Sequence, residues 1–310
     1  MTEERHRRVL VTGAAGHLGR VLLPRLLAAP DVTAVVALDR RRPALSHPRL
    51  TPVVTDLMEA DLPRLLAGVD AVIHLAFVLF PSSEERSGGA RRVNREGTAR
   101  LAVASAKAGV RRVVVAGSVA VYGAGPDLPA AIREEWPRRP LPGFAYAEDK
   151  AAIEDWLDAF APAHPALGIT RLRLAPIVGP SSQPLLNAIA RGRALPHAPA
   201  ARLQCLHEED AARAFLAALA GPPGIYNIAA EEPLPWREFA AGDGRFRLVL
   251  PLGPLDRAQR ALARLTGRFG DAGWLTGFAH PPVIATTRAA ERLAWRAERS
   301  VADCLAALRA

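Results

Sequence analysis

Tyr146 and Lys150 stand four residues apart in a segment with helical periodicity. Residues at i and i+4 share one face of a helix, so the phenol and the ammonium would lie next to each other. A free tyrosine has a pKa of about 10, which is too high for a base at neutral pH. A nearby ammonium stabilises the phenolate and lowers that pKa, so the pair is suited to general acid/base chemistry.

The scarcity of lysine and tyrosine makes this pair more informative. Lysine and arginine together number 40, yet only Lys107 and Lys150 are lysines, and Tyr122, Tyr146 and Tyr226 are the only tyrosines. A lysine carries rotatable N–H donors on a slim stem, whereas the guanidinium of an arginine is planar and bulkier. A lysine can therefore reach ribose hydroxyls while its charge stays close to the phenol, which explains why arginine does not stand at position 150.

Ser118 follows the β-branched run 113–116 and precedes Tyr122-Gly123. Ligands of α/β sheets bind at the carboxyl ends of the strands, so a hydroxyl at that place would project into a cleft. A serine that caps a turn is the alternative interpretation.

A glycine-rich turn, Thr12-Gly13-Ala14-Ala15-Gly16-His17-Leu18-Gly19, connects the first predicted strand to a helix. Such glycines let the backbone approach a pyrophosphate, and the helix N-terminus supplies amides and a favourable dipole. Asp39 ends the next predicted strand, and a carboxylate there accepts hydrogen bonds from the adenosine ribose and repels a 2′-phosphate. The turn and Asp39 predict NAD, while Arg40, Arg41 and Arg42 keep NADP as an alternative.

The elements that must position these residues alternate between strands and helices. The predicted strands are 8–12, 33–39, 52–55, 71–75, 112–117 and 169–174, and the predicted helices include 18–29, 94–108 and 146–160. This alternation predicts an α/β fold, a Rossmann-type doubly wound parallel sheet with a smaller, mostly helical C-terminal substrate lobe. A further strand at 224–229 predicts a dinucleotide-binding domain of residues 6–178 plus 205–229, and a lobe of 179–204 plus 230–310.

Composition excludes several classes of protein. The chain has 310 residues, half of them apolar, with 27 Pro and 24 Gly dispersed along it. It is neither a disulfide-stapled mini-protein nor a collagenous or disordered chain. Two distant cysteines, no apolar run of about 18 residues and no signal peptide predict a cytoplasmic protein without membrane contact. The net charge of +9 is dispersed and accompanies no reader motif, so nucleic-acid binding is not predicted.

Two charged clusters have ordinary interpretations. His207 with Glu208, Glu209 and Asp210 stands at a helix start, where acids complement the helix dipole, and we predict no metal site. Arginines 257, 260, 264 and 268 form a stripe that we interpret as a solvated basic face, with an anionic substrate as the alternative.

Several of these motifs together resemble, in order and spacing, the extended short-chain dehydrogenase/reductases, which include the NAD-dependent epimerases and dehydratases. The resemblance covers about residues 8–230. Besides the motifs above, it is carried by Asp56-Leu57, His74-Leu75-Ala76, Asn94 with Gly97-Thr98, Arg173 with Gly179-Pro180, and His207-x-x-Asp210. The tail from Arg288 to Trp295 is also similar, although Ala294 stands where the family usually has glycine.

The resemblance implies a role for each matching residue. Tyr146 would be the general acid/base, Lys150 would tune it and hold the nicotinamide ribose, and Ser118 would hydrogen-bond the reacting oxygen. The implied cofactor-binding residues are Gly13, Ala15, Gly16, His17, Leu18, Gly19, Asp39, Arg40, Asp56, Leu57, Leu75, Ala76, Asn94, Tyr146, Lys150 and Pro176. The resemblance further suggests a homodimer formed through the helices of Asn94 and Tyr146.

The sequence narrows the reaction without deciding it. Val119 and Ala120 replace the acid pair that follows the serine in sugar-nucleotide dehydratases, so dehydration is not expected. Residues 201–206 lack the Arg-Asp pair typical of sugar-nucleotide epimerases. These differences favour an NAD(P)-dependent dehydrogenase or reductase of a small molecule, with a sugar-nucleotide epimerase as the alternative. A non-catalytic dinucleotide sensor or scaffold is a more distant alternative.

Overall fold

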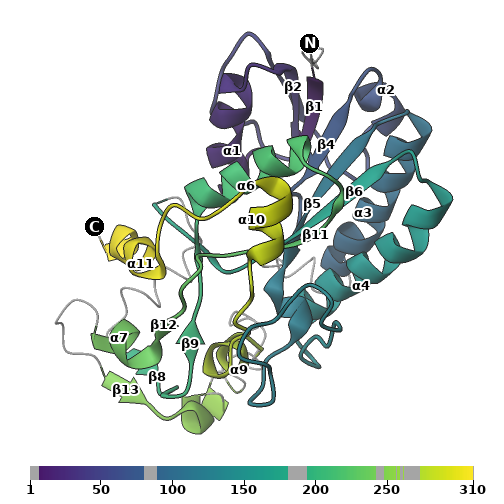
Figure 1. The fold of residues 1–310 in the computed structure, drawn as a ribbon. Coiled ribbons are helices and arrows are strands. Elements are labelled where there is room, and N and C mark those ends of the chain that lie inside the picture. Colours follow the sequence, from purple (N-terminus) through teal and green to yellow (C-terminus); the bar gives the residue numbers. More distant parts are fainter. Residues whose placement is uncertain are drawn as a thin grey trace.

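A parallel sheet of seven strands forms the centre of the computed structural model, which describes residues 7–79, 89–180, 194–241, 248–255, 257–258, 261 and 273–309 (Figure 1). The strand order is β11-β6-β5-β4-β1-β2-β3, and every neighbouring pair is parallel. The strands are β1 (Arg7–Thr12), β2 (Val32–Asp39), β3 (Leu50–Val54), β4 (Ala71–His74), β5 (Arg112–Ser118), β6 (Gly168–Leu174) and β11 (Gly224–Ile228). The predicted doubly wound parallel sheet is therefore confirmed.

Helices cover both faces of the sheet because successive strand residues point to opposite sides. Val9 and Val11 of β1 pack with α1 and α6 in one apolar cluster, whereas Leu10 packs with α2, α3 and α4 in another. The helices are α1 (His17–Ala28), α2 (Leu62–Leu66), α3 (Gly89–Lys107), α4 (Ala145–Phe160) and α6 (Glu208–Ala220). The pairs α1–α6 and α3–α4 also pack side by side, as Figure 1 shows.

The part of the chain predicted as the substrate lobe contains short helices and small sheets. The helices are α7 (Trp236–Ala241), α9 (Gly273–Ala279), α10 (Thr287–Leu293) and α11 (Val301–Arg309). The paired strands are β7 (Ile177–Val178) with β10 (Leu206–His207), β9 (Arg202–Leu203) with β12 (Leu234–Pro235), and β8 (Ala194–Pro196) with β13 (Leu248–Leu250). The boundary between the two predicted domains stays a prediction.

Hydrogen bonds connect the C-terminal part to the start of α6. The backbone amides of Glu298 and Arg299 donate to the buried Asp210 carboxylate at the start of α6. Ala294 has a left-handed backbone (φ 50°), which explains why glycine suits this position.

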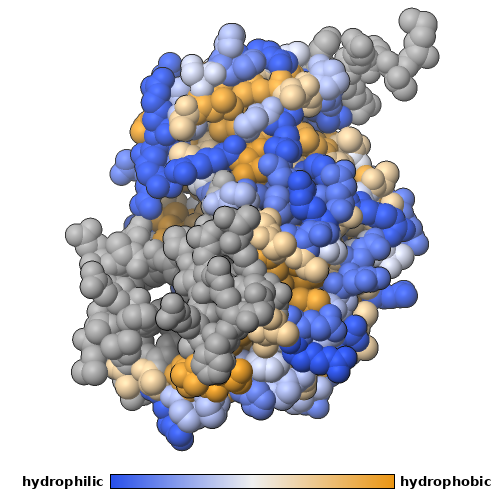
Figure 2. All heavy atoms as spheres, turned by 90° about the vertical axis from the view of Figure 1, so that its left-hand side faces the viewer, coloured by the Kyte–Doolittle hydropathy of each residue, from blue (hydrophilic) through white to orange (hydrophobic). Residues whose placement is uncertain are grey.

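On the face seen in Figure 2, hydrophilic residues cover most of the upper part, with apolar residues between them.

Candidate active site

The glycine turn brings the backbone after β1 against the end of β4. Gly13 has φ of +70°, and a Cβ atom there would lie 2.6 Å from the Ala76 nitrogen. A Cβ on Gly19 would lie 2.4 Å from the Ala14 carbonyl oxygen. The turn therefore needs glycine both for its backbone angle and for the closeness of strand and helix.

Comparing alanine substitutions at two glycines with positive φ separates the cost of backbone strain from the cost of a steric collision. We expect Gly13→Ala to lower the free energy of unfolding by more than about 2 kcal/mol and to weaken NADH binding, because strain and a backbone collision combine. Gly109 is the matched control, since it has φ of +74° and a methyl group added there would meet nothing within 4 Å. Gly109→Ala should cost only about 1 kcal/mol and leave NADH affinity intact. Urea unfolding and NADH fluorescence measure both; equal losses in the two variants would contradict the steric part.

A cavity of about 810 Å³ opens beside this turn. It is lined by most of the predicted cofactor-binding residues, namely Gly13, Gly16, His17, Leu18, Gly19, Asp39, Arg40, Asp56, Leu57, Leu75, Ala76, Tyr146 and Lys150. The cavity thus joins the glycine turn to the Tyr-Lys pair. Its size and its lining fit a dinucleotide that extends from Asp39 to Tyr146.

Three residues predicted to bind the cofactor lie just outside this lining. The Ala15 amide donates to the Asp39 carboxylate at 3.0 Å. The Asn94 side chain holds the Val78 backbone, accepting from its N–H at 2.8 Å and donating to its carbonyl at 3.2 Å. The Pro176 carbonyl accepts from the Leu206 amide. Their direct contact with a cofactor stays a prediction.

Asp39 is fixed by the backbone around it. One carboxylate oxygen accepts from the Ala15 amide and the other from the Arg41 amide at 2.9 Å. Each oxygen keeps a further lone pair, so the carboxylate can still accept hydrogen bonds from ribose hydroxyls. Arg40 and Arg41 are exposed and line the same end of the cavity.

Ser118, Tyr146 and Lys150 come together where β5 ends and α4 begins. The side chains of Ser118 and Tyr146 are hydrogen-bonded to each other. Ser118 also caps the short 3-10 helix η2 (Val119–Tyr122), accepting from the Ala120 amide, as the alternative interpretation predicted. The Lys150 Nζ donates to the Ala116 carbonyl of β5 at 2.7 Å. Tyr146 and Lys150 thus line one end of the cavity, and Ser118 joins them through its hydrogen bond with Tyr146.

Burial dominates the electrostatics of this group. It raises the pKa of Tyr146, which the hydrogen bond with Ser118 lowers less strongly. This net direction is opposite to the one predicted from the sequence, because the loss of water around the half-buried phenol outweighs its hydrogen bond. Burial also lowers the pKa of Lys150 to about 7, although the charges of Glu154 and Asp149 oppose this.

Two aromatic residues that the sequence did not indicate surround Tyr146. The Phe77 ring meets the Tyr146 ring edge-on at 5.4 Å between centroids, and the Phe144 ring lies 5.7 Å away. Phe77 directly follows the predicted His74-Leu75-Ala76 motif, so its position at the carboxyl end of a strand was the available signal. Two aromatic rings therefore flank the Tyr146 phenol.

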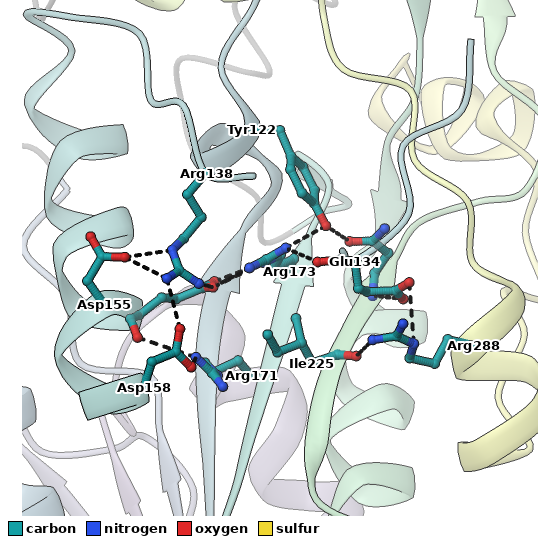
Figure 3. A network of polar contacts seen from close by, with 11 residues as sticks. Tyr122, Glu134, Arg138, Asp155, Asp158, Arg171, Arg173, Ile225 and Arg288 are labelled. Carbon is teal, nitrogen blue, oxygen red and sulfur yellow. Dashed lines mark hydrogen bonds and ion pairs between the residues drawn. The ribbon is translucent and has the colours of Figure 1, made fainter. Parts of the chain in front are cut away.

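Arg173 lies at the centre of a buried polar network that joins β6 to α4, the helix of Tyr146 and Lys150 (Figure 3). Arg173 of β6 is 1% exposed and binds both carboxylate oxygens of Glu154 on α4, with the shortest contact at 2.6 Å. Arg173 also donates to the Tyr122 hydroxyl at 2.8 Å and to the Glu134 carbonyl at 3.0 Å. It therefore links α4 to η2, which follows Ser118.

Tyr122 belongs to this buried network and not to the Ser118–Tyr146 pair. Its hydroxyl donates to the Asn227 side chain of β11 at 2.6 Å. Burial raises the pKa of Tyr122 to about 12, so it keeps its proton at neutral pH. Although its motif contributes to the resemblance, its observed contacts are structural.

A known protein family matches most of the chain. Residues 9–229 match the model of the "NAD dependent epimerase/dehydratase family". The chain belongs to this family. An uncharacterized protein of Mycobacterium tuberculosis is 32% identical over 266 residues, which cover 82% of this chain and 71% of that protein. The UDP-glucose 4-epimerase of Mycolicibacterium smegmatis is 35% identical over 189 residues, 57% of this chain and 58% of that enzyme.

The solved structure of MoeE5 in complex with UDP-glucuronic acid and NAD is similar over nearly the whole chain. It is 27% identical, covers 97% of each chain and has a TM-score of 0.73. As a member of the NAD-dependent epimerase/dehydratase family, this chain is an enzyme of the extended short-chain dehydrogenase/reductase type, and its cofactor is NAD. The glycines that exclude a Cβ atom and the anchored Asp39 fit that cofactor.

The two charged clusters of the sequence, at His207 and along the arginine stripe, can now be located in the structure. His207 caps α6, accepting from the Glu209 amide, and Glu208 pairs with His17 at 2.8 Å. In the described residues no cluster of three or more His, Cys, Asp or Glu side chains could hold a metal, and no helix suffices to cross a membrane. Of the arginine stripe, Arg257 is exposed, and Arg260, Arg264 and Arg268 lie outside the described residues.

Proposed function

We propose that this chain is an NAD-dependent oxidoreductase that transfers hydride between the nicotinamide and a carbinol or carbonyl carbon of a small molecule. The observation that carries this proposal is the hydrogen-bonded Ser118–Tyr146 pair, with Lys150 one helical turn further, at one end of a cavity that leads to Asp39. NAD supplies the hydride acceptor or donor at this place.

The chain's own residues would handle the proton. Ser118 would donate a hydrogen bond to the substrate oxygen and hold it near the Tyr146 hydroxyl. Tyr146 would remove the proton of that oxygen during oxidation and return it during reduction. The Lys150 ammonium would stabilise the phenolate and hydrogen-bond the nicotinamide ribose. The rings of Phe77 and Phe144 would limit the access of water to the phenol.

Two observations support a small-molecule oxidoreductase over the alternatives. Val119 and Ala120, which follow Ser118, carry no group for the acid step of a dehydratase. Gln204, in the segment where a sugar-nucleotide epimerase has its Arg-Asp pair, is buried and bonded to the backbone of Ala230 and Ile284. Its amide is therefore used in the fold and not for binding a diphosphate.

A sugar-nucleotide epimerase is the second candidate, favoured by the similarity to UDP-glucose 4-epimerase. The same Ser-Tyr-Lys group would serve both reactions. An assay of nicotinamide absorbance with ketones, secondary alcohols and UDP-sugars distinguishes them. Net formation or consumption of NADH supports the oxidoreductase. Interconversion of UDP-glucose and UDP-galactose without a net change in NADH would replace it with the epimerase, and tight NADH binding without any turnover would support the sensor or scaffold.

The cofactor preference depends on Asp39. We expect Asp39→Ala to weaken NADH binding by about ten-fold and to improve NADPH binding, because a ribose acceptor is lost and the repulsion of a 2′-phosphate disappears beside Arg40 and Arg41. Fluorescence titration with both cofactors measures this. Glu59→Ala, an acid outside the cavity lining, is the control. A variant that still discriminates fully against NADPH would contradict the role of Asp39.

The proposal includes predictions about the substrate, the oligomeric state and the cellular location of the enzyme. The substrate is a small molecule, with an anionic group as the alternative suggested by the basic stripe. The chain forms a homodimer through α3 and α4, and it is cytoplasmic. Sedimentation of the purified protein tests the dimer directly.

A further inference from the structure

Phe77 contacts both members of the Tyr-Lys pair. The Lys150 Nζ lies 3.8 Å from the centroid of the Phe77 ring, within the range of a cation–π interaction. The same ring meets Tyr146 in an edge-on arrangement, at an interplanar angle of 82°. Phe77 also lines the cofactor cavity. One side chain therefore touches the two residues on which the proposed reaction depends.

Lys150 is buried without a direct counter-charge. It is 7% exposed, and among the described carboxylates none forms an ion pair with it. On its own helix, Glu154 is bound by Arg173 and Asp149 by Arg95, so both act only from a distance. Such a site disfavours an ammonium, since burial removes water and no anion replaces it.

Apart from Glu154 and Asp149, the groups near Lys150 are neutral. Ala116 of β5 supplies a carbonyl, and Tyr146, on the same helix as Lys150, keeps its proton because burial raises its pKa. His74 of β4 is also uncharged, because burial, and then the charge of Lys150, lower its pKa to about 3. Besides the Ala116 carbonyl, the contacts that favour the charged form of Lys150 are thus aromatic rings, and the Phe77 centroid at 3.8 Å from Nζ is much nearer than the Tyr146 centroid at 5.9 Å.

We propose that Phe77 is a positioning residue whose ring face keeps the Lys150 ammonium charged and in place between the Ala116 carbonyl and the Tyr146 phenol. The face of an aromatic ring is electron-rich and attracts a cation, most strongly where water is excluded. Unlike a carboxylate, the ring carries no net charge and no lone pair that would bind the N–H donors of Lys150 as tightly as an ion pair does. The ammonium therefore keeps donors for the ribose while its charge remains close to the phenol.

The scarcity of lysine allows a direct test. Protein labelled with ¹³C at the lysine ε-carbon gives signals from Lys107 and Lys150 alone, and Lys107 is exposed at the end of α3. In an NMR titration, Phe77→Leu should lower the pKa of Lys150 by about one unit and leave Lys107 unchanged, because the apolar volume stays and the ring is lost. Phe77→Trp should restore the value.

Fluorinated phenylalanines at position 77 form the second arm. One, two and three fluorine atoms withdraw electrons from the ring face stepwise and change its size little. We expect the pKa of Lys150 to fall stepwise along this series. An unchanged Lys150 titration in folded Phe77→Leu, or a flat fluorine series, would overturn the proposal. If Phe77→Leu does not fold, the fluorine series decides.

The inference rests on the proposed function for its catalytic meaning, yet the titration needs no turnover. A lowered Lys150 pKa in Phe77→Leu together with a fully active Tyr146→Phe variant would refute the proposed function and leave the Phe77 contact standing. An unchanged Lys150 pKa together with an inactive Tyr146→Phe variant would do the reverse.

Discussion

Tyr146→Phe should lower kcat by about 10²–10⁴-fold, the usual contribution of general acid/base catalysis, and leave NADH binding nearly unchanged. The variant loses the hydroxyl that bonds Ser118 and would exchange a proton with the substrate oxygen. The ring that packs against Phe77 and Phe144 remains, so the cavity keeps its shape. Steady-state kinetics and NADH fluorescence titration measure the two parts of this prediction.

Tyr122→Phe is a matched control within the same motif. This variant also loses one hydroxyl, which binds Arg173 and Asn227 in the buried network. We expect a loss of about 1–3 kcal/mol in the free energy of unfolding, because buried groups are left without their partner. Turnover per folded molecule should stay close to that of the unmodified enzyme. Full activity in Tyr146→Phe, or an equal loss of kcat in both variants, would contradict the assignment of the acid/base.

Arg173→Met should lower the free energy of unfolding by about 3–5 kcal/mol, since it removes the buried partner of the Glu154 carboxylate, which keeps only a 3.5 Å contact with Arg138. Glu154 is 2% exposed, and the Tyr122 hydroxyl and Glu134 carbonyl lose the same donor. Turnover should fall as well, because Arg173 connects α4 to the segment that follows Ser118. Urea unfolding followed by circular dichroism, together with kinetics at low temperature, measures both effects.

An exposed ion pair and a double variant complete this experiment. Arg92 and Glu96 pair on α3 with side chains 68% and 64% exposed, so Arg92→Ala should change stability by less than about 1 kcal/mol. The double variant Arg173→Met with Glu154→Leu should recover part of the stability lost in Arg173→Met, because it removes the stranded charge. If Arg173→Met were as stable as Arg92→Ala, the buried pair would not hold the site together.

The sequence predicted the sheet well because its strands are short β-branched runs between helical segments. The family resemblance implied that Ser118, Tyr146 and Lys150 act together, and the structure shows the hydrogen bond between Ser118 and Tyr146. The observed cavity extends from the glycine turn to these residues, as that topology requires.

Other features depend on burial and on contacts between distant segments, which spacing does not reveal. Cys205 and Cys304, which lie far apart in the sequence, are free and buried, and their side chains are in contact. The loss of water around the Tyr146 phenol reverses the expected direction of its pKa. Strands of two residues, such as β7 and β10, are too short for any periodicity.

The Arg173 network shows the same limit. The sequence indicates Arg173 only as part of a family motif, and it does not indicate Glu154 at all. Their contact joins a strand to a helix packed on it, and nothing in the local sequence of either indicates the partner. Phe77 escapes prediction for a similar reason, because an apolar residue after a strand is ordinary until its ring is seen beneath Lys150.

The place of β11 in the sheet has a consequence for the synthesis of the chain. Strand β6 ends at Leu174, whereas its outer neighbour β11 begins only at Gly224. On the ribosome, the edge of β6 is therefore exposed while residues 175–223 are still being made. An unpaired edge strand can join the edge of another chain, so this interval is when the nascent protein is most prone to aggregate and most in need of a chaperone.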